Sequence, residues 1–146
     1  MTTVTRTYRV RPQPAVVLDY LKDFTNAEEW DPGTERCTRN DSGEIGVGSS
    51  FHNVSKLAGI STELTYTIEK LTDSQLVLVG RNETATSTDT ITVVPDPEGS
   101  GSQVTYEAVI EMSGAAKLAA PAVKVLFEKV GNEVEDDMTA ALDRLA

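Results

Sequence analysis

The sequence predicts an α+β fold in which a curved antiparallel sheet wraps around a long C-terminal helix. Two observations support this prediction. A short helical segment is followed by about six segments with strand-like alternation, and the longest amphipathic pattern comes last. A sheet that curves around one helix often encloses a ligand cavity. The length of 146 residues matches one ordinary domain, so residues 1–146 are expected to form a single domain.

The N-terminal part predicts one strand and two short helices. Threonine, valine and tyrosine alternate with a period of two over residues 2–11, which is typical of a strand. Pro14 stands where a helix starts well, and a helical period runs from Ala15 to Phe24. A second helical turn is expected from Asn26 to Trp30, with Asn26 capping its free backbone amides and Pro32-Gly33 ending it.

The central part of the chain predicts strands separated by turn residues. Hairpin-length connections between them favour antiparallel pairing. In one segment Leu64, Tyr66 and Ile68 share a face, whereas threonines and charged residues occupy the other, so one face is expected to be covered and the other wet. The expected strands span residues 34–39, 49–57, 61–71, 75–83, 86–94 and 103–112, with turns at 40–43, Ala58-Gly59 and 95–101.

The segment from Ala115 to Ala146 predicts a long amphipathic helix. Pro121 lies close enough to its start to fit a first turn, or it splits off a short preceding helix over residues 115–120. Acidic residues at 133 and 135–137 group on the polar side, where a solvated face is the ordinary interpretation and a metal site a rare one. The apolar stripe consists of Leu118, Ala122, Val125, Leu126, Val130, Val134, Met138, Ala141, Leu142 and Leu145.

Composition and charge exclude several classes of function. The net charge of -10 repels phosphate backbones and anionic headgroups, so nucleic acid is not an expected partner. No apolar run approaches the roughly 20 residues that span a bilayer, and the N-terminus lacks a signal-peptide core, so we expect a cytoplasmic protein without integral membrane association. Cys37 is the only cysteine, which excludes an internal disulfide. No pattern predicts a cofactor or a metal, and monomer and homodimer both stay open.

Several segments together carry a family resemblance. In their order and spacing they resemble the polyketide cyclase/dehydrase and lipid-transport family of the START-like, Bet v 1-like (SRPBCC) superfamily, and the resemblance covers essentially the whole chain. It implies a helix-grip fold, with seven antiparallel strands around the C-terminal helix and two short helices after the first strand. The segments are Trp30-Asp31-Pro32-Gly33, Val47-Gly48-Ser49-Ser50-Phe51, Leu64-Thr65-Tyr66-Thr67-Ile68, Gln103-Val104-Thr105-Tyr106-Glu107-Ala108 and the final helix.

This architecture predicts a hollow between sheet and helix, and strand alternation predicts its wall. Such a wall is mostly aliphatic, with Tyr66, Tyr106 and Asn53 as polar groups, which suits a hydrophobic molecule that bears a hydroxyl or carbonyl. Close packing could instead fill the hollow, although the small residues Gly80 and Ala108 leave room. The expected ligand-binding residues are Trp30, Phe51, Asn53, Leu64, Tyr66, Ile68, Leu78, Ile91, Tyr106, Ala108 and Val125. Ser55, Leu76, Val93, Val104, Ile110 and Met112 are also expected to face inward.

No group of residues identifies a catalytic centre. Cys37 lacks an oriented base, since His52 lies in a different strand and alternates with the inward-facing Phe51. Asp31 is a candidate acid near the mouth of the hollow, although an aspartate before Pro-Gly more commonly caps a turn. Trp30 either gates the mouth or anchors its helix to the core.

The sequence therefore favours binding of a hydrophobic small molecule, such as a lipid, a polyketide or an aromatic compound. The resemblance keeps a polyketide cyclase or dehydratase activity in the same cavity as the alternative, because such cyclases are described as working largely by shaping a flexible substrate. A protein-interaction module with an incidental cavity is a third hypothesis, in which the acidic surface steers a basic partner. Nothing in the sequence decides whether the protein is an enzyme.

Overall fold

The computed structural model describes residues 1–57 and 59–146, and in them it forms a seven-stranded antiparallel sheet. The strand order is β1-β7-β6-β5-β4-β3-β2, so β1 pairs with the last strand, and each strand from β2 to β6 pairs with the one that follows it in sequence. The predicted strands are confirmed, each with its ends within two residues of the expected ones. They are β1 (Thr2–Val10), β2 (Thr34–Arg39), β3 (Ser50–Leu57), β4 (Ile60–Leu71), β5 (Gln75–Arg81), β6 (Ala85–Pro95) and β7 (Ser102–Met112). Ala58 of the expected Ala58-Gly59 turn lies outside the described residues.

The helices follow the predicted order, with one correction. Asn26 does not cap α2 with its side chain, because Asn26 is itself helical and its amide donates a hydrogen bond to the carbonyl of Tyr20 at 2.8 Å. The side-chain cap in this region is Asp23, which caps the preceding 3-10 helix by accepting from the amide of Thr25 at 3.2 Å. Pro121 lies in the first turn of α3, and a 3-10 helix precedes it. The elements are α1 (Pro14–Leu21), η1 (Phe24–Asn26), α2 (Ala27–Trp30), η2 (Gly114–Ala119) and α3 (Ala120–Asp143).

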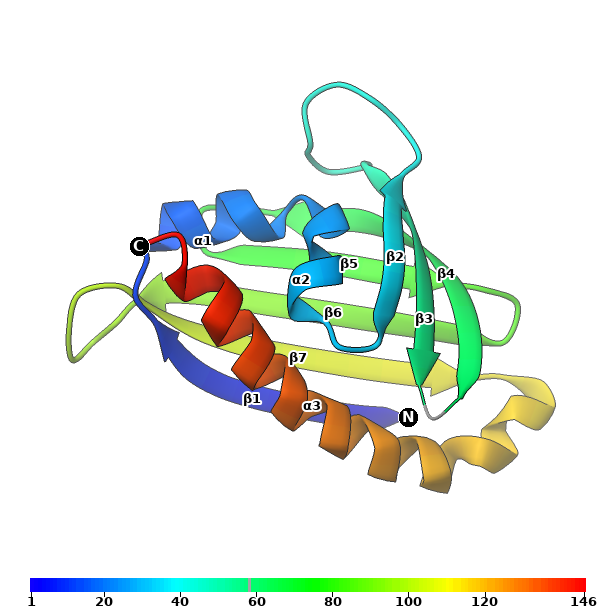
Figure 1. Cartoon of the computed structure of the whole chain (residues 1–146). Coiled ribbons are helices and arrows are strands. Elements are labelled where there is room, and N and C mark those ends of the chain that lie inside the picture. The colour runs from blue at the N-terminus through cyan, green and yellow to red at the C-terminus, as the bar shows by residue number, and fades with distance from the viewer. Residues whose placement is uncertain (58) are drawn as a thin grey trace.

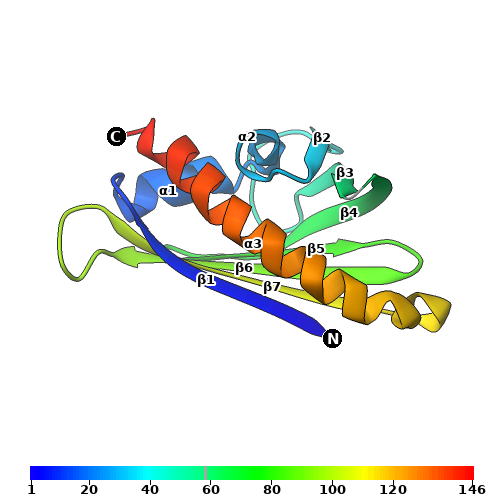
Figure 2. The same ribbon diagram turned by 60° about the horizontal axis from the view of Figure 1, so that its bottom comes forward.

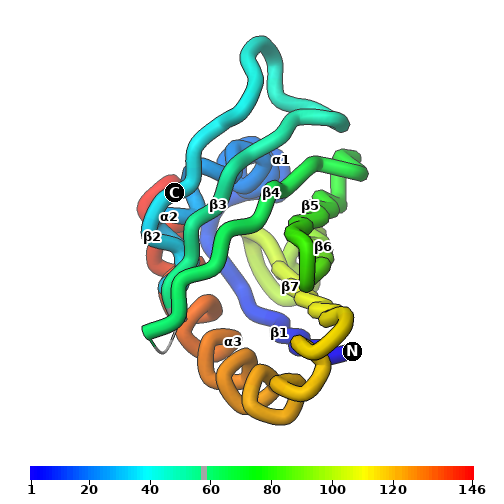
Figure 3. The backbone as a smooth tube through the Cα atoms, turned by 90° about the vertical axis from the view of Figure 1, so that its right-hand side faces the viewer, coloured from blue at the N-terminus to red at the C-terminus, as the bar shows by residue number. Residues whose placement is uncertain are grey.

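The helices cover the concave face of the sheet. In Figure 1, α3 runs along β1 while α1 and α2 lie near the end of the sheet where α3 finishes. Figure 2 shows the three helices together on one side of β1, β7, β6 and β5. Viewed from the side, the strands curve round so that β4, β3 and β2 rise beside the helices (Figure 3). This arrangement is the helix-grip fold that the sequence predicts.

The hydrophobic core fills only part of the space within this curve. Phe24 lies at its centre, with its ring centroid 4.7 Å from that of Tyr66 and 5.9 Å from that of Trp30. The C-terminal half of α3 contributes Met138 and Leu142, which are fully buried, whereas the N-terminal half buries no side chain completely. The sheet contributes Phe51, Ile68, Leu76, Leu78, Ile91, Val93 and Val104. Packing is therefore dense under α1, α2 and the end of α3, and looser under the start of α3.

Two glycines allow close approaches that shape this interior. Gly80 of β5 pairs across the sheet with Tyr66, and a Cβ atom at position 80 would lie 2.6 Å from Cζ of that ring. The Tyr66 ring thus occupies the space that the missing side chain leaves. Gly131 of α3 has a similar role, since a Cβ atom there would lie 2.7 Å from Cγ1 of Val4 in β1. A larger residue at position 131 would therefore require the Val4 side chain or α3 to shift.

Candidate functional site

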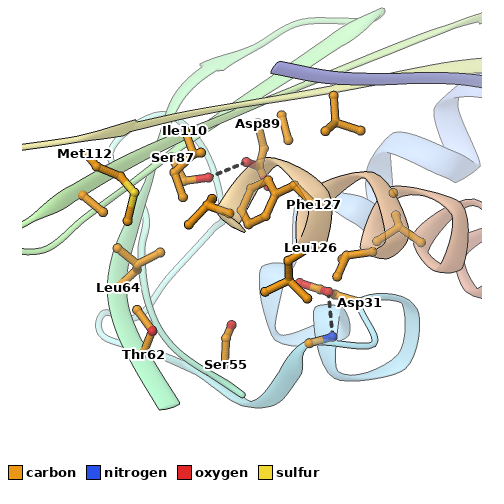
Figure 4. Close-up of a pocket in the computed structure, with 18 of the residues that line it drawn as sticks. Asp31, Ser55, Thr62, Leu64, Ser87, Asp89, Ile110, Met112, Leu126 and Phe127 are labelled. Atoms are coloured by element: carbon orange, nitrogen blue, oxygen red, sulfur yellow. Dashed lines mark hydrogen bonds between the residues drawn. The ribbon is translucent and has the colours of Figure 1, made fainter. Parts of the chain in front are cut away.

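A cavity of about 390 Å³ lies between the sheet and the N-terminal half of α3. This volume lies within the range of roughly 300–1,000 Å³ that is typical of small-molecule sites. Figure 4 shows Leu126 and Phe127 of α3 on one side of the space and Ile110 and Met112 of β7 on another. The apolar part of the lining consists of Val4, Ile60, Leu64, Ala85, Ala108, Ile110, Met112, Ala119, Val123, Leu126, Phe127, Val130 and Val134.

The structure brings four of the expected ligand-binding residues to this cavity, namely Leu64, Tyr66, Tyr106 and Ala108. Ser55, Ile110 and Met112 of the expected inward set also line it. Five others face inward but lie in the packed core away from the cavity, because the inner face of the sheet extends under α1 and α2 as well. These five are Phe51, Asn53, Ile68, Leu78 and Ile91, each at most 2% exposed.

Val125 does not line the cavity, and its side chain is 73% exposed. The cavity side of α3 is formed by Leu126, Phe127 and Val130, and one residue step turns the side chain by about 100° around a helix axis. Val125 therefore points away from the space that Leu126 and Phe127 face. The expected apolar stripe was too wide at its N-terminal end, where Leu118 is exposed as well.

Trp30 anchors α2 to the core and does not form part of the cavity lining. Its side chain is 1% exposed, and its ring contacts Tyr106 edge to face with centroids 5.9 Å apart. The indole Nε1 is buried and has no hydrogen-bond acceptor within residues 1–57 and 59–146. Of the two roles considered for Trp30, the geometry matches the anchor, and through Tyr106 the anchor supports the cavity wall.

A buried polar cluster on β6 and β7 forms part of the cavity wall. Asp89 is 5% exposed, and its Oδ2 accepts a hydrogen bond from the hydroxyl of Tyr106 at 2.5 Å. Its Oδ1 accepts from the hydroxyl of Ser87 at 3.2 Å, as the dashed line in Figure 4 marks. Asp89 and Ser87 were not among the residues expected from the sequence. The signal was present, because the alternation that turns Ile91 and Val93 inward turns residues 87 and 89 to the same face.

Burial changes the proton affinity of this cluster. Loss of solvent, with a smaller contribution from nearby Asp31, raises the pKa of Asp89 to about 6, although the two hydroxyl donors partly oppose the rise. Burial also raises the pKa of Tyr66 and of Tyr106 well above the ordinary phenol value, with the Asp89 carboxylate adding to the effect. Both phenols therefore stay protonated at neutral pH, whereas Asp89 changes its protonation close to physiological pH.

Asp31 supplies a second carboxylate to the lining, from the turn after α2 (Figure 4). It caps that turn, which is the commoner of the two roles considered for it, by accepting from the Gly33 amide and the Thr34 hydroxyl, both at 3.0 Å. The Asn53 amide in turn donates to the Thr34 hydroxyl at 3.0 Å, so Asn53 supports Asp31 from behind. Burial raises the pKa of Asp31, and Asp137 on α3 raises it further.

Arg6 is the one cation among the described residues that line the cavity, and its guanidinium is bound to α3. Nη2 donates to the Glu128 carboxylate at 3.0 Å, and Nε donates to the side-chain oxygen of Asn132 at 3.0 Å. Nη1 donates to the carbonyl of Thr5 at 2.9 Å. Arg6 therefore ties β1 to α3 beside the cavity, with its charge balanced by Glu128.

Comparison with known proteins identifies the family. The whole chain, residues 1–146, matches the family model described as polyketide cyclase / dehydrase and lipid transport. The chain belongs to this family. No curated protein matches the sequence.

Solved structures share the fold of this family member at low sequence identity. A START superfamily protein from Mycobacterium smegmatis superposes with a TM-score of 0.81 at 15% identity, covering 100% of both chains. TTHA0849 from Thermus thermophilus has the same TM-score at 13% identity, covering 99% of both. The Zhui aromatase/cyclase from Streptomyces sp. R1128 reaches 0.78 at 12% identity, over 97% of this chain and 93% of its own. At these identities the likeness establishes the fold alone.

The other candidate residues of this polyketide cyclase/dehydrase family member lie apart from the cavity. Burial raises the pKa of the Cys37 thiol to about 12, which disfavours the thiolate that a nucleophile needs. His52 is on the opposite face of β3 from Phe51, and its Nε2 lies 2.7 Å from a carboxylate oxygen of Glu63. Glu133, Asp136 and Asp137 are exposed on α3.

Within residues 1–57 and 59–146, no group of three or more His, Cys, Asp or Glu residues is arranged to hold a metal ion. No helix in that part of the chain is both long and apolar enough to cross a membrane.

Proposed function

We propose that this protein binds a hydrophobic small molecule in the cavity under the N-terminal half of α3. The observation that carries the proposal is the cavity itself, because protein interiors are otherwise packed as densely as organic crystals. Its lining is predominantly aliphatic, with the hydroxyl and carboxyl groups of Tyr106 and Asp89 gathered on one wall. An apolar space with a few convergent polar groups is typical of a ligand-binding site.

The proposal is tested by purifying the protein from its own host and identifying any co-purifying compound by native mass spectrometry and organic extraction. Ala108→Trp fills the cavity from β7, and Glu111→Trp places the same side chain on an exposed position of the same strand as a matched control. We expect a bound compound in the wild type and in Glu111→Trp, and none in Ala108→Trp. Equal loading of Ala108→Trp would mean that the compound binds elsewhere and would contradict the proposal.

A second candidate function is cyclisation or dehydration of a polyketide-like substrate in the same cavity. One observation favours it: Asp89 faces the cavity, is hydrogen-bonded to Tyr106, and has a pKa raised to about 6. A carboxyl group with a pKa near the working pH is suited to general acid or base catalysis. The structural neighbour Zhui is named as an aromatase/cyclase, which makes this chemistry worth testing here.

The two candidates are separated by Asp89→Asn, which keeps the size of the side chain and one acceptor oxygen but removes its ability to exchange a proton. Incubation of the extracted compound, or of a β-hydroxy ketone of similar size, is followed by mass spectrometry for loss of water. An enzyme would turn the compound over in the wild type and lose most of that rate in Asp89→Asn. A compound that binds both the wild type and Asp89→Asn, and that neither protein converts, would support binding without catalysis.

A further inference from the structure

In the part of the cavity wall that the structure describes, the charge is negative and no cation is available to a ligand. Among the described residues that line the cavity, the ionisable groups are two carboxylates, Asp31 and Asp89, three phenols and one guanidinium. Asp31 and Asp89 accept hydrogen bonds only from hydroxyl groups and a backbone amide. Arg6, the single cation of the described lining, directs its nitrogens to Glu128, Asn132 and Thr5.

The carboxylates lie on different parts of the wall. Asp89 is on the sheet at the centre of β6, opposite Ala108 of β7, whereas Asp31 is on the turn that follows α2 (Figure 4). Each carboxylate oxygen has two lone pairs, and each of these four oxygens accepts one hydrogen bond from a protein group. Acceptor capacity therefore remains for a donor on a ligand. A ligand that enters this space meets acceptors on both sides.

We propose that the cavity selects a hydrophobic ligand whose polar end is an uncharged or cationic hydrogen-bond donor, such as a hydroxyl, a phenol or a protonated amine, and excludes carboxylates such as fatty acids. This inference rests on the proposed binding function and narrows its ligand class. A ligand carboxylate would bring a third negative charge into an apolar space beside Asp31 and Asp89, where charges repel strongly because solvent screens them poorly. A hydroxyl or an ammonium group can instead donate to Asp89 or Asp31.

The net charge of the whole protein also disfavours anionic ligands. With 23 acidic and 13 basic residues, the protein repels anions at long range as well as inside the cavity. Arg6 does not offset this effect, because its ion pair with Glu128 leaves the pair neutral. Discrimination against anions is therefore built into the lining and does not depend on the shape of the cavity.

The experiment compares probes that share an apolar body and differ at the polar end. The probes are 2-naphthol, 2-(aminomethyl)naphthalene and 2-naphthoate, together with 1-decanol, decylamine and decanoate below their micelle concentrations, measured by isothermal titration calorimetry at pH 7.5. We expect each carboxylate to bind at least tenfold more weakly than the alcohol with the same body. We also expect each amine to bind at least as tightly as the alcohol.

Asp89→Asn and Asp31→Asn should each reduce the ratio between the affinities of the alcohol and the carboxylate with the same body. The double variant should reduce this ratio to less than threefold. Asp136→Asn, which removes a carboxylate from an exposed position on α3, is the control and should leave the ratio unchanged. A carboxylate that binds the wild type within threefold of its alcohol overturns the inference and leaves the binding function standing. Absence of binding by all six probes, in the wild type as in Ala108→Trp, would overturn the binding function together with the inference.

Discussion

The buried Asp89 should make the stability of the protein fall as pH rises through the weakly acidic range. In the unfolded chain the carboxyl ionises with a pKa of 3.8, and in the folded protein with a pKa of about 6. Between these values the folded state holds a proton that the unfolded state has lost, so raising the pH favours unfolding. The contribution of a protonated Asp89 is fully present below pH 3.8 and is lost as pH rises through about 6.

The size of this effect follows from the two pKa values. Each pKa unit is equivalent to about 1.4 kcal/mol, so the change from 3.8 to about 6 corresponds to about 3 kcal/mol. Asp89 is 5% exposed, so solvent screening does not reduce this magnitude much. A loss of about 3 kcal/mol is a large part of the stability of a typical small domain, which is about 5–15 kcal/mol.

The assay is urea unfolding at half-unit steps from pH 3.5 to 7.5 for the wild type and Asp89→Asn. The difference in unfolding free energy between them removes the contribution of other titrating groups to first order. We expect the wild type to lose about 3 kcal/mol relative to Asp89→Asn across this range, with most of the loss between pH 4 and 6. Asp31→Asn should reduce the loss, because the charge of Asp31 helps to raise the pKa of Asp89. A difference that stays constant with pH would show that Asp89 is solvated in the folded protein and would refute the reasoning.

Three further substitutions or modifications test the cavity wall and the core. Gly80→Ala should destabilise the protein by about 1–3 kcal/mol in urea unfolding, because its Cβ would lie 2.6 Å from the Tyr66 ring, whereas Gly46→Ala, with open space around its Cβ, should change stability by less than about 0.5 kcal/mol. Tyr66→Phe should weaken binding of 2-naphthol while leaving the unfolding midpoint close to wild type, and unchanged affinity would remove the Tyr66 hydroxyl from the site. Cys37, whose pKa burial raises to about 12, should react with iodoacetamide at pH 8 at least a hundredfold more slowly in the folded protein than in 8 M urea. Equal rates would place the thiol in solvent.

The order and bounds of the strands could be predicted from the sequence because they depend on local signals. Alternation along a strand and turn residues at its ends act over a few positions, and the same is true of Pro14 at the start of α1. Alternation also predicts which side chains of a strand face inward, and Leu64, Tyr66 and Ile68 do lie on the inner face of the sheet. The cap of α2 was predicted wrongly because Asn26 competes for a more distant partner, the carbonyl of Tyr20.

The position of the cavity along the inner face could not be predicted in this way, because it depends on which helix covers each part of the sheet. Phe51 of β3 and Tyr66 of β4 are directly opposite each other in the sheet, yet only Tyr66 lines the cavity. Phe51 lies against Phe24 of η1, and its place in the core is decided by a segment far away in the sequence.

Asp89 was missed for a related reason: an acidic residue in a strand is ordinarily assigned to the wet face, and its sequence neighbours are threonines and a serine. Only the combination of alternation with the apolar residues Ile91 and Val93 places its carboxylate inside. An ionisable residue at a position where strand alternation predicts an inward-facing side chain is therefore a better candidate for a functional site than one at an outward-facing position. Burial of a carboxylate is unfavourable, and here the cost is offset only partly by Tyr106 and Ser87. Such a residue is suited to a site in which a ligand supplies the remaining hydrogen bond.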